Sequence, residues 1–180
     1  MKLKINYTYI NRYQKLSDKF IKKYNDKIDW YDISQYQKLP EQFIEKYSDK
    51  VEWDVICEFQ ELKESFIEKN SNNIDWRVIS CHQKLSEKFI EKYFNKLHWD
   101  LIVIYQDLSI DFIDLYIKEI ELCNNFYTKD MFKDILWRNI SIYQNLSEKF
   151  IEKYSDKVDW VYIMSLQKLS EQFRISFGNK

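Results

Sequence analysis

Hydrophobic and polar positions along this chain follow a helical period that restarts every 23 residues. In the segment after Gln83, apolar residues spaced at i, i+4, i+5 and i+8 mark one face of an α-helix: Leu85, Phe89, Ile90 and Tyr93. A second apolar stripe begins at the Trp of each segment. The pattern predicts two short helices per unit, a helix A of roughly nine residues and a helix B that starts at Trp.

The period is visible in Gln and Trp. Gln recurs in steps of 23 at Gln14, Gln37, Gln60, Gln83 and Gln106, then at Gln144 and Gln167. Trp precedes each of these Gln by seven residues, except that Tyr7 stands before Gln14. The gap of 38 between Gln106 and Gln144 is one period plus 15 residues. Helices of two to three turns are unstable alone, so each unit must pack on its neighbours. The sequence therefore predicts an all-α protein, an α-solenoid of tandem 23-residue two-helix repeats with one 15-residue insertion.

Counting the repeats predicts one domain over residues 1–180 with seven helices B and seven helices A. It comprises a half-unit cap at 1–13, regular repeats at 14–105, an irregular repeat with the insertion at 106–143, and regular repeats at 144–180. No apolar run approaches the length of a membrane span, and we expect no signal peptide.

Local signals predict where these helices begin and end. Acidic residues before Trp suit helix N-caps, and flanking Ile, Val or Leu residues suit hydrophobic staples. Ser86 suits the start of a helix A, and Pro40 replaces Ser there. Gly178 suits a left-handed residue after the last helix. The expected helix B caps are Asn6, Asp29, Glu52, Asp75 and Asp159.

The insertion carries apolar residues where sister repeats carry charge. Ile110 and Leu115 are therefore expected to pack against the added segment. We expect helix A to continue through Leu122, and a second short helix to begin at Thr128. Insertions in repeat proteins often carry binding residues, although this one can equally be a tolerated duplication. The candidates are Tyr127, Lys129 and Asp130.

Composition narrows the function. One Gly in 180 residues leaves no Gly-rich phosphate loop, and a net charge of −1 removes the simple electrostatic case for a DNA-coating protein. Three Cys without a CxxC motif favour a reducing, cytoplasmic location. No pair among Cys57, Cys81, His82, His98 and Cys123 has metal-ligand spacing. We therefore expect no metal, no cofactor and no enzymatic activity.

Constant positions are best explained by packing. The aromatic position of Tyr36, Phe59 and Tyr105, taken by His82 in one repeat, is assigned to the core. The repeated Gln is expected to form a ladder that satisfies backbone groups of adjacent turns. The alternative is that stacked Gln side chains read an extended ligand, as in base-reading helical repeats.

Variable positions on helix B are the candidates for partner binding. Residues one and five places after Trp are i, i+4 neighbours beside the core stripe. Repeat proteins diversify the exposed positions that face a partner, although neutral drift on a solvated surface gives the same pattern. The candidate residues are Tyr31, Gln35, Asp54, Glu58, Arg77, Asp100, Arg138 and Tyr162.

The motif Gln-x-Leu-Ser-Glu-x-Phe-Ile followed by Val-Asp-Trp-x-x-Ile-Ser resembles short Trp-containing helical repeats in proteins of large DNA viruses and phages. It spans roughly residues 5–177 apart from the insertion. The resemblance implies a virus- or phage-encoded interaction protein that inhibits a host defence factor. It brings no catalytic residues with it.

Three functions follow as expectations. The first is a non-catalytic module, monomeric or weakly self-associating, that occupies the surface of another, host-encoded protein. The second is a repeat protein that binds RNA or single-stranded nucleic acid. The third is a self-assembling module, because the terminal repeats retain Tyr7, Tyr9, Phe173 and Phe177.

Overall fold

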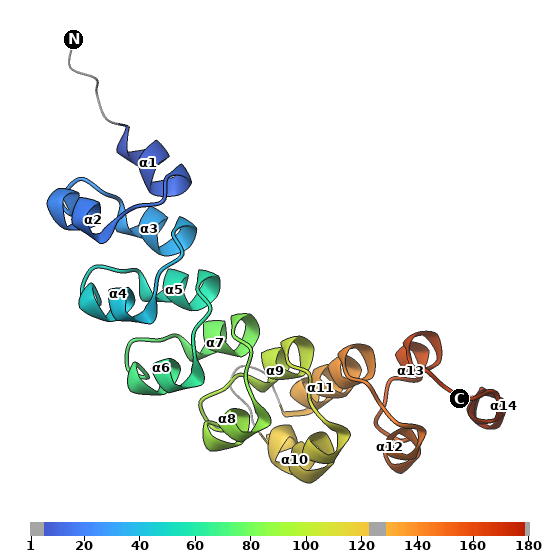
Figure 1. Cartoon of the computed structure of the whole chain (residues 1–180). Helices are drawn as coiled ribbons and strands as arrows, with labels where there is room; N and C mark the ends of the chain where they lie inside the picture. The colour runs from blue at the N-terminus through green and yellow to red at the C-terminus, as the bar shows by residue number, and fades with distance from the viewer. Residues whose placement is uncertain (1–5, 123–128, 179–180) are drawn as a thin grey trace. The chain divides into compact units, whose positions relative to one another are not determined.

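The computed structural model describes residues 6–122 and 129–178 (Figure 1). Helices B and A alternate throughout this part of the chain, seven of each, and it contains no strand. The helices B are α1 (Tyr7–Tyr13), α3 (Trp30–Tyr36), α5 (Trp53–Phe59), α7 (Trp76–His82), α9 (Trp99–Tyr105), α11 (Lys129–Tyr143) and α13 (Trp160–Leu166). The helices A are α2 (Asp18–Tyr24), α4 (Glu41–Lys46), α6 (Glu64–Lys69), α8 (Glu87–Lys92), α10 (Ile110–Leu122), α12 (Glu148–Lys153) and α14 (Glu171–Phe177).

The chain forms two compact units, residues 1–83 and 84–180. In unit 1, α1 packs on α3, α3 on α5 and α5 on α7. In unit 2, α9 packs on α11 and α11 on α13. This contact between consecutive helices B confirms the all-α solenoid of tandem 23-residue, two-helix repeats with a 15-residue insertion. The assignment of residues 1–180 to a single domain stays a prediction.

The core of each unit is built from the same repeat positions. The third residue after the Trp of each helix B is an Ile with no exposed surface, and every helix A except α14 contributes a second buried Ile. Burying one such side chain contributes about 1.5–3 kcal/mol to the free energy of folding, so these Ile side chains together supply much of the stability between repeats. The helix B positions are Ile33, Ile56, Ile79, Ile102, Ile140 and Ile163.

Most of the predicted caps are confirmed. The Asp29 carboxylate accepts hydrogen bonds from the backbone N–H groups of Tyr31 and Asp32, and Asp75 caps α7 in the same way. Asp159 caps α13 with one such bond, from the Val161 N–H. Asn6 caps α1. The Glu52 side chain makes no capping bond although the residue occupies the N-cap position.

Two expected helix ends were wrong. Regular helices A have six or seven residues instead of nine, because the chain leaves the helix into a turn closed by bonds from Lys50 and Val51 N–H to the Tyr47 carbonyl. Gly178 has φ −67° and ψ −5°, a right-handed conformation, so it does not end α14 as a left-handed residue.

The insertion lengthens two existing helices. α10 continues through Leu122 as expected. The separate short helix expected from Thr128 was wrong, because α11 runs unbroken from Lys129 through Trp137 to Tyr143. The cause lies at Leu136, which stands where other repeats carry an N-cap such as Asp159. Leu has no oxygen to cap a helix start, and Leu136 is fully buried inside the continuous helix.

A second substitution accompanies this missing cap. In the following repeat, the Ser141 hydroxyl accepts the backbone N–H of the N-cap residue Asp159 at 3.0 Å. The residue equivalent to Ser141 on α9 is Val103, which has no hydroxyl. None is required, because the Leu136 N–H belongs to the interior of α11 and bonds within that helix. Val103 and Leu136 are therefore two consequences of one continuous helix.

The apolar stripe of α10 differs from the one expected. Leu115 is 69% exposed, so its expected packing against the added segment was wrong. Ile113, Ile117 and Ile120 are buried instead, at i, i+4 and i+7 of one helical face. Phe132 of α11 is buried as well. The insertion thus extends the core of unit 2.

Glu121 fastens the insertion to the next repeats. Its Oε1 accepts the indole N–H of Trp137 at 2.8 Å and pairs with Lys157 Nζ at 2.7 Å, and its side chain is only 13% exposed. Burial alone would raise the pKa of the Glu121 carboxyl, but the bonds from Lys157 and Trp137 outweigh it and lower the pKa below its ordinary value.

Candidate interaction surface

A ladder of Gln side chains joins consecutive repeats. The Gln60 amide nitrogen donates to the carbonyls of Ser34 and Gln37, both at 2.8 Å, and its oxygen accepts the backbone N–H of Leu39 at 2.9 Å. Equivalent sets of three bonds are made by Gln37, Gln83, Gln144 and Gln167.

These bonds settle the role of the repeated Gln within the described residues. Both amide hydrogens of Gln60 are used on carbonyls at the end of the preceding helix B, and the side chain is buried. The ladder expected from the sequence is confirmed. A saturated, buried amide has no donor left for a ligand, so these side chains do not read one.

At α14, the Arg174 side chain bonds the carbonyls that a ladder Gln bonds in the other repeats. Its guanidinium donates to the carbonyl of Met164 at 2.8 Å and to that of Gln167 at 3.3 Å. These two carbonyls stand where Ser34 and Gln37 stand for Gln60. Arg174 itself occupies the position of the buried Ile151 in the preceding helix A. A polar side chain thus replaces the core Ile and takes the acceptors that a further repeat would use.

An exposed aromatic row is the clearest surface feature of the repeats. The last residue of helix B is an exposed aromatic in most repeats, so its assignment to the core was wrong. Six residues after the Trp, a side chain lies about 120° around the helix from that Trp and about 60° from the buried Ile, at the edge of the buried stripe. We call these residues the aromatic row: Tyr13 (69% exposed), Tyr36 (48%) and Phe59 (45%) in unit 1, and Tyr105 (59%) and Tyr143 (51%) in unit 2. His82 and Leu166, at the same position, are exposed too.

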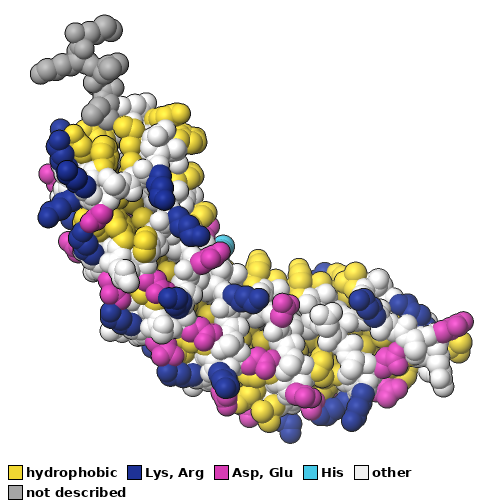
Figure 2. Space-filling model, in the orientation of Figure 1, with side chains coloured by type: hydrophobic (Ala, Val, Ile, Leu, Met, Phe, Trp, Pro, Cys, Tyr) yellow, Lys and Arg dark blue, Asp and Glu magenta, His cyan; other side chains and the backbone are white. Residues whose placement is uncertain are grey.

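In unit 1 the aromatic row borders a groove of about 1400 Å³. Figure 2 shows hydrophobic side chains exposed between Lys and Arg side chains over this part of unit 1. The groove follows the turns between helices B and A from α1 to α6. Its row residues are Tyr13, Tyr36 and Phe59, and its charged lining residues are Arg12, Lys15, Lys38, Lys46, Lys63, Asp18, Glu41 and Glu61.

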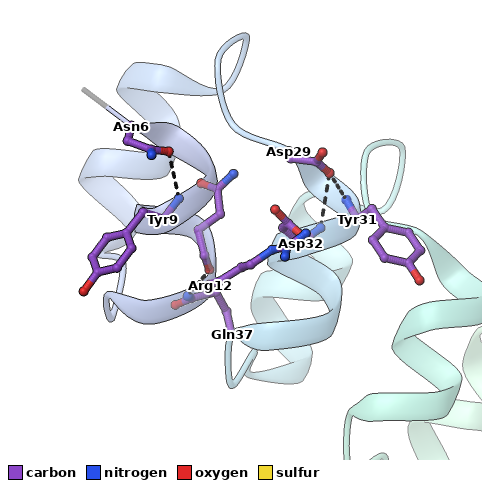
Figure 3. Close-up of polar contacts among 8 residues, drawn as sticks. Asn6, Tyr9, Arg12, Asp29, Tyr31, Asp32 and Gln37 are labelled. Carbon is purple, nitrogen blue, oxygen red and sulfur yellow. Dashed lines mark hydrogen bonds and ion pairs between the residues drawn. The ribbon is translucent and has the colours of Figure 1, made fainter. Parts of the chain in front are cut away.

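Arg12 is held at one end of this groove. Its Nε lies 2.9 Å from Asp32 Oδ1 (Figure 3), and the Asp32 side chain is 4% exposed. The Arg12 guanidinium lies 5.3 Å from the Tyr36 ring centroid. The hydrogen bond to Asp32 raises the pKa of Arg12 above its ordinary value. Arg12 therefore orients the Tyr36 ring and neutralises a nearly buried carboxylate.

The predicted variable positions are spread along helix B surfaces. Tyr31, Asp54, Glu58, Arg77 and Arg138 are exposed, while Gln35, Asp100 and Tyr162 are partly buried. Gln35 lines the groove.

One contact brings two of the predicted residues together. Arg138 donates to the Tyr162 hydroxyl at 2.8 Å and lies 5.3 Å from its ring centroid. Tyr162 is two places after its Trp, outside the two positions that define the predicted set.

The candidates in the insertion cannot be placed as a site. Tyr127 lies outside the described residues. Lys129 and Asp130 begin α11, but their side chains are not described. Sequence reasoning also missed the aromatic row, and the signal was its recurrence just before Gln, a position that sequence alone does not separate from the core.

Among the residues that the structure describes, no group of three or more His, Cys, Asp or Glu is placed to hold a metal ion. Cys57 is fully buried, and burial raises the pKa of its thiol to about 12, so the nucleophilic thiolate is scarce there. None of the helices within residues 6–122 and 129–178 has both the length and the apolar content needed to cross a bilayer.

Comparisons with known protein families, with curated proteins and with solved structures gave no match. The link to viral and phage repeat proteins therefore stays a prediction. The function has to be argued from the surface of the repeats.

Proposed function

We propose that this protein is a non-catalytic, protein-binding helical-repeat module that acts by occupying a partner's surface. The observation that carries the proposal is the aromatic row. Tyr13, Tyr36 and Phe59 stay about half exposed or more, so a large part of each ring is left uncovered by the repeat array itself. Aromatic side chains supply large contact area at low entropic cost, and they dominate the energetics of protein interfaces.

Rigid positioning supports the same proposal. Tyr36 and Phe59 immediately precede Gln37 and Gln60, which are bonded to the preceding repeat, so the backbone beneath these two rings is fixed before a partner arrives. We extend the proposal to a cytoplasmic protein, encoded by a virus or phage, that inhibits a host factor. This extension rests on the sequence resemblance and the sparse Cys.

Nucleic-acid binding is the competing function. Exposed aromatic rings stack on bases, and Lys residues line the groove of unit 1. Against it, the Gln amides that would read base edges are used within the fold, and acidic residues share the groove. Protein binding is the better supported function.

Two double variants on α3, α5 and α7 test the proposal. Tyr36→Ser with Phe59→Ser removes two rings from the aromatic row, and Tyr31→Ser with Arg77→Glu alters the variable positions predicted from sequence. All four residues are exposed, so helicity by circular dichroism should be unchanged in both variants. The assay is capture of proteins from a lysate of the native host after nuclease treatment, read by mass spectrometry.

We expect the row variant to lose a specifically captured protein that the Tyr31→Ser, Arg77→Glu variant retains. Loss in the second variant alone would move the binding surface to the variable positions. Disappearance of every partner on nuclease treatment would contradict the proposal and favour nucleic acid.

A further inference from the structure

We infer that the groove of unit 1 binds an extended, acidic peptide segment of a partner protein. The inference rests on the proposed function and names the chemistry of its ligand. Three features of the groove support it: the charges that remain unpaired, the spacing of its aromatic rings, and the shortage of the basic contacts that a nucleic acid needs.

The charges in the groove divide into paired and unpaired groups. Asp18 pairs with Lys46 at 2.7 Å, and its Oδ1 also accepts the Tyr47 hydroxyl at 3.3 Å. Glu41 accepts the backbone N–H of Lys63 at 2.9 Å and lies 3.8 Å from its ammonium group. Two of the three acids that line the groove are therefore occupied.

The basic residues leave a surplus. Arg12 is paired with Asp32, outside the groove lining. The side chains of Lys15 and Lys38 make no ion pair or hydrogen bond with other described residues, and both are exposed. Glu61 is the single unpaired acid among the lining residues. The groove thus offers two free cations, in consecutive repeats, and prefers a ligand with negative charge.

These cations alternate with rings. Lys15 follows Tyr13 by two residues and Lys38 follows Tyr36 by two, so the first two repeats of the groove each present one ring and one ammonium group. Packed helices lie about 8–10 Å apart, and an extended peptide advances about 3.3 Å per residue. About three ligand residues therefore span one repeat. The matching ligand has an acidic residue at every third position with an apolar residue beside it.

The same groove suits nucleic acid less well. A single strand carries one phosphate per nucleotide and needs basic contacts along its length. In the third repeat of the groove the position of Lys15 and Lys38 is taken by Glu61. A peptide tolerates this acid, because its side chain at that subsite is free to be neutral or basic.

The test is fluorescence anisotropy with labelled peptides of about ten residues built from a repeated Glu-Leu-Ser unit. Gln-Leu-Ser and Lys-Leu-Ser peptides and a labelled oligouridine of similar length complete the set. The proteins are the full chain, Lys15→Glu with Lys38→Glu, and a matched control, Lys19→Glu with Lys22→Glu. The control residues are exposed Lys of α2 that do not line the groove.

We expect the Glu peptide to bind best and to lose affinity in NaCl. Lys15→Glu with Lys38→Glu should weaken it about tenfold or more, while the control changes it less than about threefold. Equal losses in the two double variants would overturn the inference. Equal binding of the Gln peptide, dependent on Tyr36 and Phe59, would overturn the acidic ligand but leave the proposed function standing. Oligouridine binding tighter than every peptide would overturn both.

Discussion

The Gln144 amide donates to the Gln106 carbonyl at 2.9 Å across 38 residues, with the same bond that joins Gln37 to Gln14 at 3.0 Å across 23 residues. Its second hydrogen goes to the Val103 carbonyl at 2.8 Å, and its oxygen accepts the Leu108 N–H at 3.2 Å. The insertion therefore leaves the contact between repeats intact. What sets the register of the array is this trio of hydrogen bonds and not the length of chain between them.

The ladder predicts that replacing one buried Gln lowers the free energy of unfolding substantially. Gln60→Ala leaves the carbonyls of Ser34 and Gln37 and the N–H of Leu39 without their partner. Each unsatisfied buried group costs about 1–3 kcal/mol, so we expect a loss of about 3 kcal/mol in the free energy of unfolding. Urea unfolding followed by circular dichroism measures it.

Gln14→Ala is the matched control for this loss. The Gln14 side chain is exposed and donates no hydrogen bond to any described residue. We expect it to change stability by less than about 0.5 kcal/mol. Similar losses in Gln14→Ala and Gln60→Ala would show that the ladder bonds do not stabilise the fold.

Arg174 predicts a change in association state. Arg174→Ile restores the residue found at Ile151 and frees the Met164 and Gln167 carbonyls on an apolar surface. We expect this variant to self-associate as its concentration rises, and the natural chain to associate less. Sedimentation equilibrium measures it, with Arg138→Ile as a control on α11. If the Arg174→Ile protein stays as monomeric as the control, Arg174 does not limit self-association.

The contacts of Glu121 predict that its contribution to the stability of the fold depends on pH. Its pKa is lower in the folded chain than in the unfolded chain, where it is about 4.3. The carboxylate therefore contributes stability that is present above pH 4.3 and is lost as pH falls through the folded pKa. Glu121→Gln should cost about 1 kcal/mol at neutral pH, and the difference should vanish in acid.

Thermal unfolding of the natural chain and of Glu121→Gln between pH 7 and pH 3 checks this prediction. Many carboxylates titrate in this range, so the difference between the two proteins is the informative quantity. A difference that stays constant across the range would mean that Glu121 acts through its shape alone.

The two described thiols should differ in reactivity. Cys57 is fully buried with a thiol pKa of about 12, whereas Cys81 is partly exposed, and burial raises its pKa less strongly. In a Cys123→Ser background, iodoacetamide should modify Cys81 first and reach Cys57 only when the chain unfolds. Mass spectrometry of the alkylated peptides reads both sites. Rapid labelling of Cys57 in the folded protein would contradict the burial of this residue.

Much of the fold could be predicted from sequence because repetition averages out local ambiguity. Seven copies of one pattern fix the two helices, the caps such as Asp29 and the buried Ile of helix B. The continuous helix α11 was missed although its signals, Val103 and Leu136, are in the sequence. Each is a single change whose meaning depends on the other, and only the structure brings them together.

The candidate surface was harder to predict for a physical reason. The aromatic at the position of Tyr36 recurs in most repeats, as the core residues do, and recurrence alone indicates burial. Whether such a ring is buried depends on how neighbouring helices are rotated against each other, and the residue types do not fix that rotation. Tyr36 is 48% exposed and lies only about 60° around α3 from the buried Ile33, so it stands at the edge of the buried stripe, where the rotation of the neighbouring helices decides its exposure.

The Gln ladder also predicts that α1 and α13 differ in local stability. In unit 1 the exposed Gln14 makes no side-chain hydrogen bond to any described residue, so it adds nothing to the bonds that Gln37 and Arg12 make between α1 and α3. In unit 2 Arg174 fastens α14 to both carbonyls at the end of α13. Amide hydrogens should therefore exchange earlier in α1 than in α13, because Gln167 bonds α13 to the preceding repeat whereas Gln14 makes no such bond.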